Sequence, residues 1–108
     1  MVTLVGQNLS EFDLHLRAIL GLPIQKISYF SEAAASYAIL ADQESSEAPE
    51  ISGIEEALKL DDVDLRIFNK PSTRKNRRMA VTLATGADVA HARKKARDSA
   101  EKIKLKYN

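Results

Sequence analysis

The stretch VDLRIFNKPSTRKNRRMAVTLATG, residues 63–86, decides the fold of this 108-residue chain. Apolar side chains alternate with polar or small ones from Val63 to Ile67 and again from Met79 to Leu83. This period of two is typical of half-buried strands. The segment between the two runs contains Asn, Pro and Ser, which favour turns. We therefore expect a β-hairpin with a long loop at its tip.

The loop of this hairpin is strongly basic. Between Leu65 and Ala87 there are six Lys or Arg residues and no acid: Arg66, Lys70, Arg74, Lys75, Arg77 and Arg78. One interpretation is a solvated hairpin tip that protects a sheet edge from aggregation. In the other, Arg77 or Arg78, which point to opposite faces of a strand, holds a phosphate bidentately while Lys70 supplies a point charge across the turn.

The acidic residues form a separate block just before the basic run. Between Asp42 and Asp64 the only basic residue is Lys59, and there are nine acidic ones: Asp42, Glu44, Glu47, Glu50, Glu55, Glu56, Asp61, Asp62 and Asp64. The net charge is only +1, whereas a nucleic-acid-binding protein usually shows a basic excess that is global or spread along one face. This segregation favours a focused anion site.

Composition sets the wider frame. A content of 44% hydrophobic and 29% charged residues is globular, and the length suits one domain. The chain has no cysteine, which excludes disulfides and thiolate metal sites. Its apolar runs are far shorter than the roughly 20 residues that span a bilayer, and its start lacks the order of a signal peptide. We expect a soluble, cytoplasmic protein.

The N-terminal part predicts a helix that begins after Ser10, with Asp13 as the acid of a capping box, and ends at Gly21 and Pro23. Its apolar stripe needs a covering partner: Phe12, Leu16, Ile19 and Leu20. A buried strand is expected over 36–41, although the alanines at 33–35 could begin a helical turn. The polar segment 42–50 is the expected mobile loop.

Downstream, Ser52 could cap a short helix that runs to Leu60. Asp88 is expected to cap a long last helix, followed by a terminal strand in which Ile103, Leu105 and Tyr107 alternate with lysines. The helix carries an apolar stripe of mostly small residues that can lie close to a sheet: Val89, Ala92, Ala96, Ala100 and Ile103. The predicted class is α+β, with antiparallel strands and a long helix.

Catalytic chemistry is not visible in the sequence. His15 lies beside Phe12 and Ile19 and is more typical of a core or boundary residue, and His91 is weaker still as a catalyst. Gly-rich phosphate loops, nucleophile elbows and metal-binding histidine pairs are absent. We predict no catalytic residue and no metal site, so the chain could be one part of a larger enzyme.

Three separated segments carry a family resemblance. The first is MVTLVGQNLSEFDLHLRAILGLP, residues 1–23, and the others are LRIFNKP, residues 65–71, and RRMAVTLAT, residues 77–85. In this order, and followed by the alanine-striped helix, they resemble the C-terminal portion of the formate-dependent phosphoribosylglycinamide formyltransferase 2 family of the ATP-grasp superfamily. The related carboxyaminoimidazole ribonucleotide synthase family is similar at the first helix and remains the alternative within the superfamily.

The resemblance implies a division into two parts and a site. Residues 1–24 would end the ATP-grasp domain, and residues 25–108 would form a small C-terminal domain of the rudimentary hybrid-motif type. Lys70, Arg77 and Arg78 match the family residues that contact the ribonucleotide. Ala80 stands where the family usually has Gly, which puts close backbone approach at that strand in doubt. The acidic segment 42–50 looks longer and more charged than usual.

The resemblance also implies a reaction and partners. The family phosphorylates formate with ATP, and the amine of glycinamide ribonucleotide attacks the formyl phosphate in purine biosynthesis. The nucleotide-binding residues and the magnesium glutamates of the family lie upstream of Met1, so this chain alone is expected to be inactive and to bind neither ATP nor Mg²⁺. A homodimer is expected for the full-length enzyme. Two other classes remain open: a standalone anion- or nucleic-acid-binding module that uses the hairpin, and an interaction domain that uses the apolar stripe of the first helix.

Overall fold

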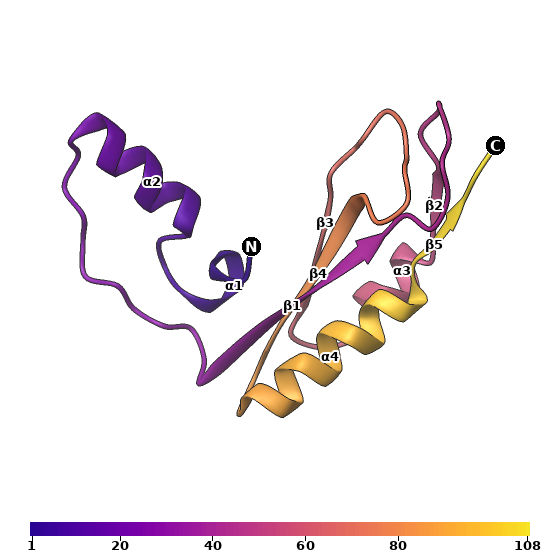
Figure 1. Ribbon diagram of the computed structural model, residues 1–108. Coiled ribbons are helices and arrows are strands. Elements are labelled where there is room, and N and C mark those ends of the chain that lie inside the picture. The colour runs from indigo at the N-terminus through magenta and orange to yellow at the C-terminus, as the bar shows by residue number, and fades with distance from the viewer.

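The computed structural model describes residues 1–108 and contains a three-stranded antiparallel sheet in the order β1–β4–β3 (Figure 1). Its strands are β1 (Ala33–Leu40), β3 (Val63–Ile67) and β4 (Arg78–Gly86). β4 is central, and it is buried along most of its length. Val63 pairs with Ala84 and Ile67 pairs with Ala80, so β3 and β4 form the predicted hairpin with the basic loop at its tip.

The long helix α4 (Val89–Lys102) lies against this sheet, as Figure 1 shows. Asp88 caps it as predicted, because its carboxylate accepts a hydrogen bond from the backbone N–H of His91 at 2.8 Å. Ala92, Ala96 and Ala100 are buried against the sheet, and small side chains allow this close approach. Val89 is the exception in the predicted stripe, since it is 59% exposed.

A second, two-stranded sheet extends the body beyond the end of α4. It pairs β2 (Glu50–Ser52) with β5 (Lys104–Lys106), and the short helix α3 (Ile54–Leu58) follows β2. The terminal strand is therefore confirmed. None of the helices combines the length and the hydropathy that a membrane-spanning segment requires.

One local prediction, and one alternative that the sequence left open, were wrong. The alanines at 33–35 belong to β1, because Ala33 pairs with Gly86 and Ala35 with Ala84. Ser52 does not cap a helix, because its pairing with Lys104 holds it in a strand. Gly53 takes the N-cap position in the left-handed region, with a φ of 83°. A Cβ at Gly53 would lie 1.8 Å from the carbonyl oxygen of Lys102, so glycine is required at this close approach.

The N-terminal part contains α1 (Thr3–Gly6) and the predicted helix α2 (Glu11–Leu20). Ser10 and Asp13 form the predicted capping box. The backbone N–H of Ser10 donates to the Asp13 carboxylate at 3.0 Å, and this bond holds the pKa of Asp13 below its usual range. Gly21 ends α2 in the left-handed conformation.

Helix α2 stands apart from the sheet and is joined to it by an extended segment, as Figure 1 shows. The apolar stripe of α2 is exposed, with Ile19 at 66% and Leu20 at 61%. The radius of gyration is 15.6 Å, whereas about 13 Å is usual for a compact domain of this length. The projection of α2 accounts for this difference.

Candidate functional site

The basic loop joins β3 to β4 and has a fixed base. The backbone N–H of Phe68 donates to the carbonyl of Met79 at 3.0 Å, which continues the ladder of the hairpin by one bond. Asn69 and Asn76 have positive φ angles of 52° and 67°. Asparagine adopts this left-handed conformation more readily than most residues. The chain therefore turns at both ends of the loop where the sequence supplies asparagine.

The structure places the three predicted site residues on this one loop. Lys70 follows the first turn and is half-buried, Arg77 follows the second turn and is half-buried, and Arg78 is the exposed first residue of β4. None of the three makes an ion pair with a carboxylate, and the same holds for Arg74 and Lys75. The positive charge of the loop is therefore available to an external anion.

Arg77 is oriented from within the loop. Its guanidinium donates to the Ser72 hydroxyl at 3.0 Å and to the Ser72 carbonyl at 3.3 Å. Both bonds use the same Nη1 nitrogen, so the other guanidinium donors remain free. Ser72 thus restricts where Arg77 can present those donors.

The start of the acidic segment fastens the loop to the body. We call residues 41–45 the brace. Ser45 and Thr73 exchange two backbone hydrogen bonds, at 2.9 and 3.2 Å, and the hydroxyl of Thr73 donates to the carbonyl of Gln43 at 3.0 Å. Ala41 exchanges two more backbone bonds with the loop, with Arg77 at 2.8 Å and with Asn76 at 2.7 Å. The segment expected to be mobile is therefore bonded to the predicted site.

The brace is itself held by the C-terminus of the chain. The phenolic oxygen of Tyr107 accepts a hydrogen bond from the backbone N–H of Asp42 at 3.0 Å. Burial raises the pKa of Tyr107, because the charged phenolate would be desolvated there. Tyr107 therefore accepts the hydrogen bond from the brace as a neutral phenol.

Sequence reasoning missed the supporting residues Ser72, Thr73 and Tyr107. Thr73 is only 4% exposed although it lies inside a polar, charged loop. A buried threonine in such a loop indicates a tertiary contact, but no local periodicity marks it. The signal was visible only once the loop and the brace were placed side by side.

Neither histidine of the chain lies in the basic loop. His15 is exposed on α2, and His91 hydrogen-bonds to Asp88 at 2.7 Å at the exposed start of α4. No three His, Cys, Asp or Glu side chains are grouped so that they could hold a metal ion. Several Lys and Arg donors on one braced loop suit a phosphate group.

Sequence comparisons place the chain among known proteins. A family model described as "PurT, C-terminal" matches residues 34–103. The formate-dependent phosphoribosylglycinamide formyltransferase of Trichormus variabilis is 51% identical over 105 residues, and that of Geobacter metallireducens is 47% identical over the same length. Each alignment covers 97% of this chain and 26% of the relative. The chain thus spans about a quarter of the length of the curated relatives it matches.

Two solved structures have the same fold over most of the chain. Glycinamide-RNase-transformylase T from Mycobacterium tuberculosis superposes with a TM-score of 0.70 and 32% identity, over 95% of this chain and 25% of that one. N5-carboxyaminoimidazole ribonucleotide synthetase from Thermotoga maritima superposes with a TM-score of 0.85 and 27% identity, over 98% of this chain and 29% of that one.

Proposed function

This chain belongs to the PurT C-terminal family, and from that membership we propose that it supplies a ribonucleotide-binding loop to an ATP- and formate-dependent phosphoribosylglycinamide formyltransferase. The full-length enzyme would formylate glycinamide ribonucleotide through formyl phosphate in purine biosynthesis. Lys70, Arg77 and Arg78 would contact the phosphate end of that ribonucleotide. The chain alone would not turn over substrate.

The observation that carries this proposal is the braced loop without ion pairs. A phosphate dianion needs several donors that neighbouring carboxylates have not already neutralised. The loop provides them, and the brace and Ser72 limit the orientations that must be lost when a ligand binds. A solvated hairpin tip would need neither a buried threonine nor an arginine held by its own loop.

Fold and sequence rank the two related enzymes differently. The synthetase from T. maritima superposes better, but sequence identity to the formyltransferases is 47–51% against 27% for the synthetase. Backbone similarity reports a shared fold, whereas substrate choice depends on side chains. The sequence comparison therefore carries more weight, and the synthetase remains the second candidate.

The domain boundary is also a proposal. Residues 1–24 would belong to the end of the ATP-grasp domain and residues 25–108 to the C-terminal domain. The exposed apolar stripe of α2 and its separation from the sheet support this division, because a helix with one apolar face is stable only when that face is covered. The rest of the same enzyme would cover it. A cytoplasmic homodimer is part of the proposal on the family resemblance alone.

ATP and Mg²⁺ would be bound elsewhere in the full-length enzyme. This chain groups no acidic side chains that fit a magnesium ion. Residues outside this sequence would hold the nucleotide and the metal, which supply the activated phosphoryl group. The contribution of this chain would be to bind and orient the ribonucleotide.

The test uses the natural polypeptide that contains this chain. Arg77→Gln and Arg78→Gln should each weaken glycinamide ribonucleotide binding in isothermal titration by about ten- to a hundredfold, because each removes a charge-assisted hydrogen bond. ATP affinity should stay unchanged. Arg66→Gln is the matched control, since it removes one positive charge from β3, where Arg66 pairs with Asp64 at 3.0 Å.

Two outcomes would contradict the proposal. Unchanged ribonucleotide binding in both variants would make the basic loop a solvated surface. Turnover with aminoimidazole ribonucleotide in place of glycinamide ribonucleotide and formate would assign the enzyme to the synthetase family.

A further inference from the structure

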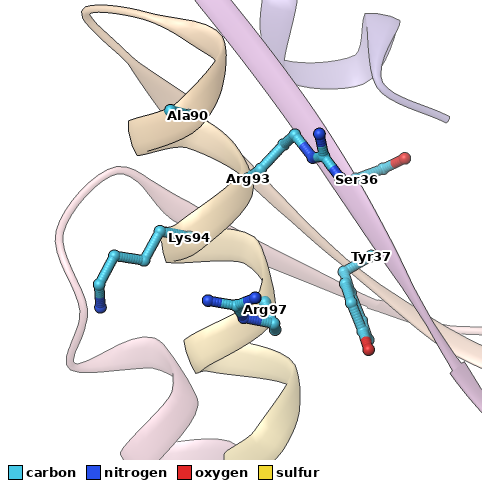
Figure 2. Close-up of a pocket in the computed structure, with 6 residues that line it drawn as sticks. All are labelled: Ser36, Tyr37, Ala90, Arg93, Lys94 and Arg97. Carbon is cyan, nitrogen blue, oxygen red and sulfur yellow. The ribbon is translucent and has the colours of Figure 1, made fainter.

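A second cluster of positive charge lies between β1 and α4, away from the basic loop. A cavity of about 340 Å³ is lined by Ser36, Tyr37, Ala90, Arg93, Lys94 and Arg97. Figure 2 shows Arg93 reaching from α4 toward β1 at Ser36, whose hydroxyl points to the other side of the strand, and Lys94 pointing away from β1. Small-molecule sites begin at about 300 Å³, so the cavity is large enough for a small ligand.

The two arginines have no anionic partner within the chain. Lys94 pairs with Asp98, which lowers the pKa of that carboxyl, and Lys95 pairs with Asp62 at 2.9 Å. Arg93 and Arg97 make no ion pair. They stand one turn apart on the same side of α4, where like charges disfavour the helix by a few tenths of a kcal/mol. A bound anion would remove this repulsion.

The strand beside these arginines offers further hydrogen-bonding groups. β1 is an edge strand that pairs only with β4, so alternate residues of β1 direct backbone N–H and C=O groups away from the sheet. Tyr37 adds a hydroxyl on the face of β1 that α4 covers, and its side chain is exposed. The aromatic ring of Tyr37 offers a flat apolar face, which a simple phosphate would not use.

We propose that the groove between β1 and α4 is a second anion site that binds a phosphate ester through Arg93 and Arg97, with the hydroxyl of Tyr37 as a hydrogen-bonding partner. It is separate from the basic loop and independent of the function proposed for that loop. A long nucleic acid is disfavoured as the ligand, because the cations occupy little more than one turn of one helix in a chain of net charge +1. The chemistry fits a small molecule with one or two phosphates.

The experiment isolates this groove from the basic loop. In the natural polypeptide that contains this chain, Arg77→Gln and Arg78→Gln are introduced together so that anions bound by the loop do not contribute. Pyrophosphate is then titrated by calorimetry, and protection of individual arginines from phenylglyoxal is read by mass spectrometry. We expect saturable binding and selective protection of Arg93 and Arg97.

Variants then test the residues. Arg93→Gln with Arg97→Gln should weaken pyrophosphate binding at least about tenfold, which corresponds to about 1.4 kcal/mol. Lys102→Gln removes one charge from the same helix outside the cavity, so it should leave the affinity unchanged. Inorganic phosphate and a nucleoside monophosphate are titrated beside pyrophosphate to identify the part of the ligand that is recognised. Equal affinity for the three compounds would mean that a single phosphate group is bound. Tighter binding of the monophosphate would mean that Tyr37 contacts the nucleoside.

Three results would overturn the proposal. The first is the absence of saturable pyrophosphate binding or of arginine protection. The second is an equal loss in the Lys102 variant, which would indicate diffuse attraction to the helix. The third is binding of a glutamate-rich peptide but not of any phosphate probe, which would make the open edge of β1 a protein contact.

Discussion

Substituting Thr73 by valine tests whether the brace positions the basic loop. Thr73→Val keeps the shape of the side chain and removes the bond from the Thr73 hydroxyl to the carbonyl of Gln43 at 3.0 Å. The backbone bonds between Thr73 and Ser45 remain available. Because Gln43 is exposed and its carbonyl can turn to water, we expect a loss of about 1 kcal/mol in the free energy of unfolding.

The same free energy sets the expected effect on binding. If the loss falls entirely on the attachment of the loop, the loop spends more time in arrangements that cannot bind the ribonucleotide. A change of about 1 kcal/mol corresponds to at most about a fivefold weaker apparent affinity. Urea unfolding followed by circular dichroism gives the first quantity, and isothermal titration of glycinamide ribonucleotide into the natural polypeptide gives the second.

Thr82→Val is the matched control. The hydroxyl of Thr82 is fully buried and donates to the carbonyl of Ala96 at 2.6 Å, which joins β4 to α4. This variant should lose at least as much stability as the Thr73 variant but keep its ribonucleotide affinity, because it leaves the brace intact. Equal affinities in the two folded variants would refute a positioning role for Thr73.

Two further predictions concern the framework. Tyr107→Phe should lower the free energy of unfolding by about 1 kcal/mol at neutral pH, because it leaves the Asp42 N–H without its acceptor. The raised pKa of Tyr107 stabilises the fold at pH values below the usual pKa of tyrosine, and this contribution is lost as the pH rises through the raised value. Urea unfolding at neutral and alkaline pH should therefore show a smaller loss of stability on alkalinisation in the variant than in the unsubstituted protein. Gly53→Ala should lower the free energy of unfolding by at least about 2 kcal/mol in thermal or urea unfolding, because left-handed strain adds to the clash with Lys102. Gly21→Ala is the control: with a φ of 66° and no atom within 4 Å of the added Cβ, it should show the strain alone, about 1 kcal/mol. Equal losses of stability in the two variants would contradict the clash at Gly53.

The elements that sequence predicted correctly have local signals. The hairpin follows from alternation within β3 and β4, and α4 follows from its Asp88 cap and its alanines. The capping box and Gly21 define α2 in the same way. Each signal lies within a few residues of the element that it predicts, so no knowledge of distant pairing was needed.

The predictions that failed depended on distant pairing. Ser52 has a residue type suited to an N-cap, but β5 pairs with it across 52 positions of sequence and keeps it extended. The alanines at 33–35 favour a helix intrinsically, yet pairing with β4 makes them a strand. The brace was invisible for the same reason, since its bonds use mostly backbone groups, which every residue carries. The sequence named the residues that are proposed to bind the ribonucleotide, but it did not name the residues whose hydrogen bonds support the loop.

The brace also explains how an acidic segment can lie against a basic loop without neutralising it. Ion pairs from Asp42, Glu44 or Glu47 to the loop would occupy the donors that an external phosphate needs, and the structure contains none. The two segments are joined instead by four backbone bonds and one threonine hydroxyl. Such neutral bonds fix geometry with little dependence on charge or salt, whereas ion pairs between exposed side chains are weak and screened. The backbone of the loop is therefore fastened by neutral hydrogen bonds while its cations have no carboxylate partner, and this combination suits the anion site proposed above.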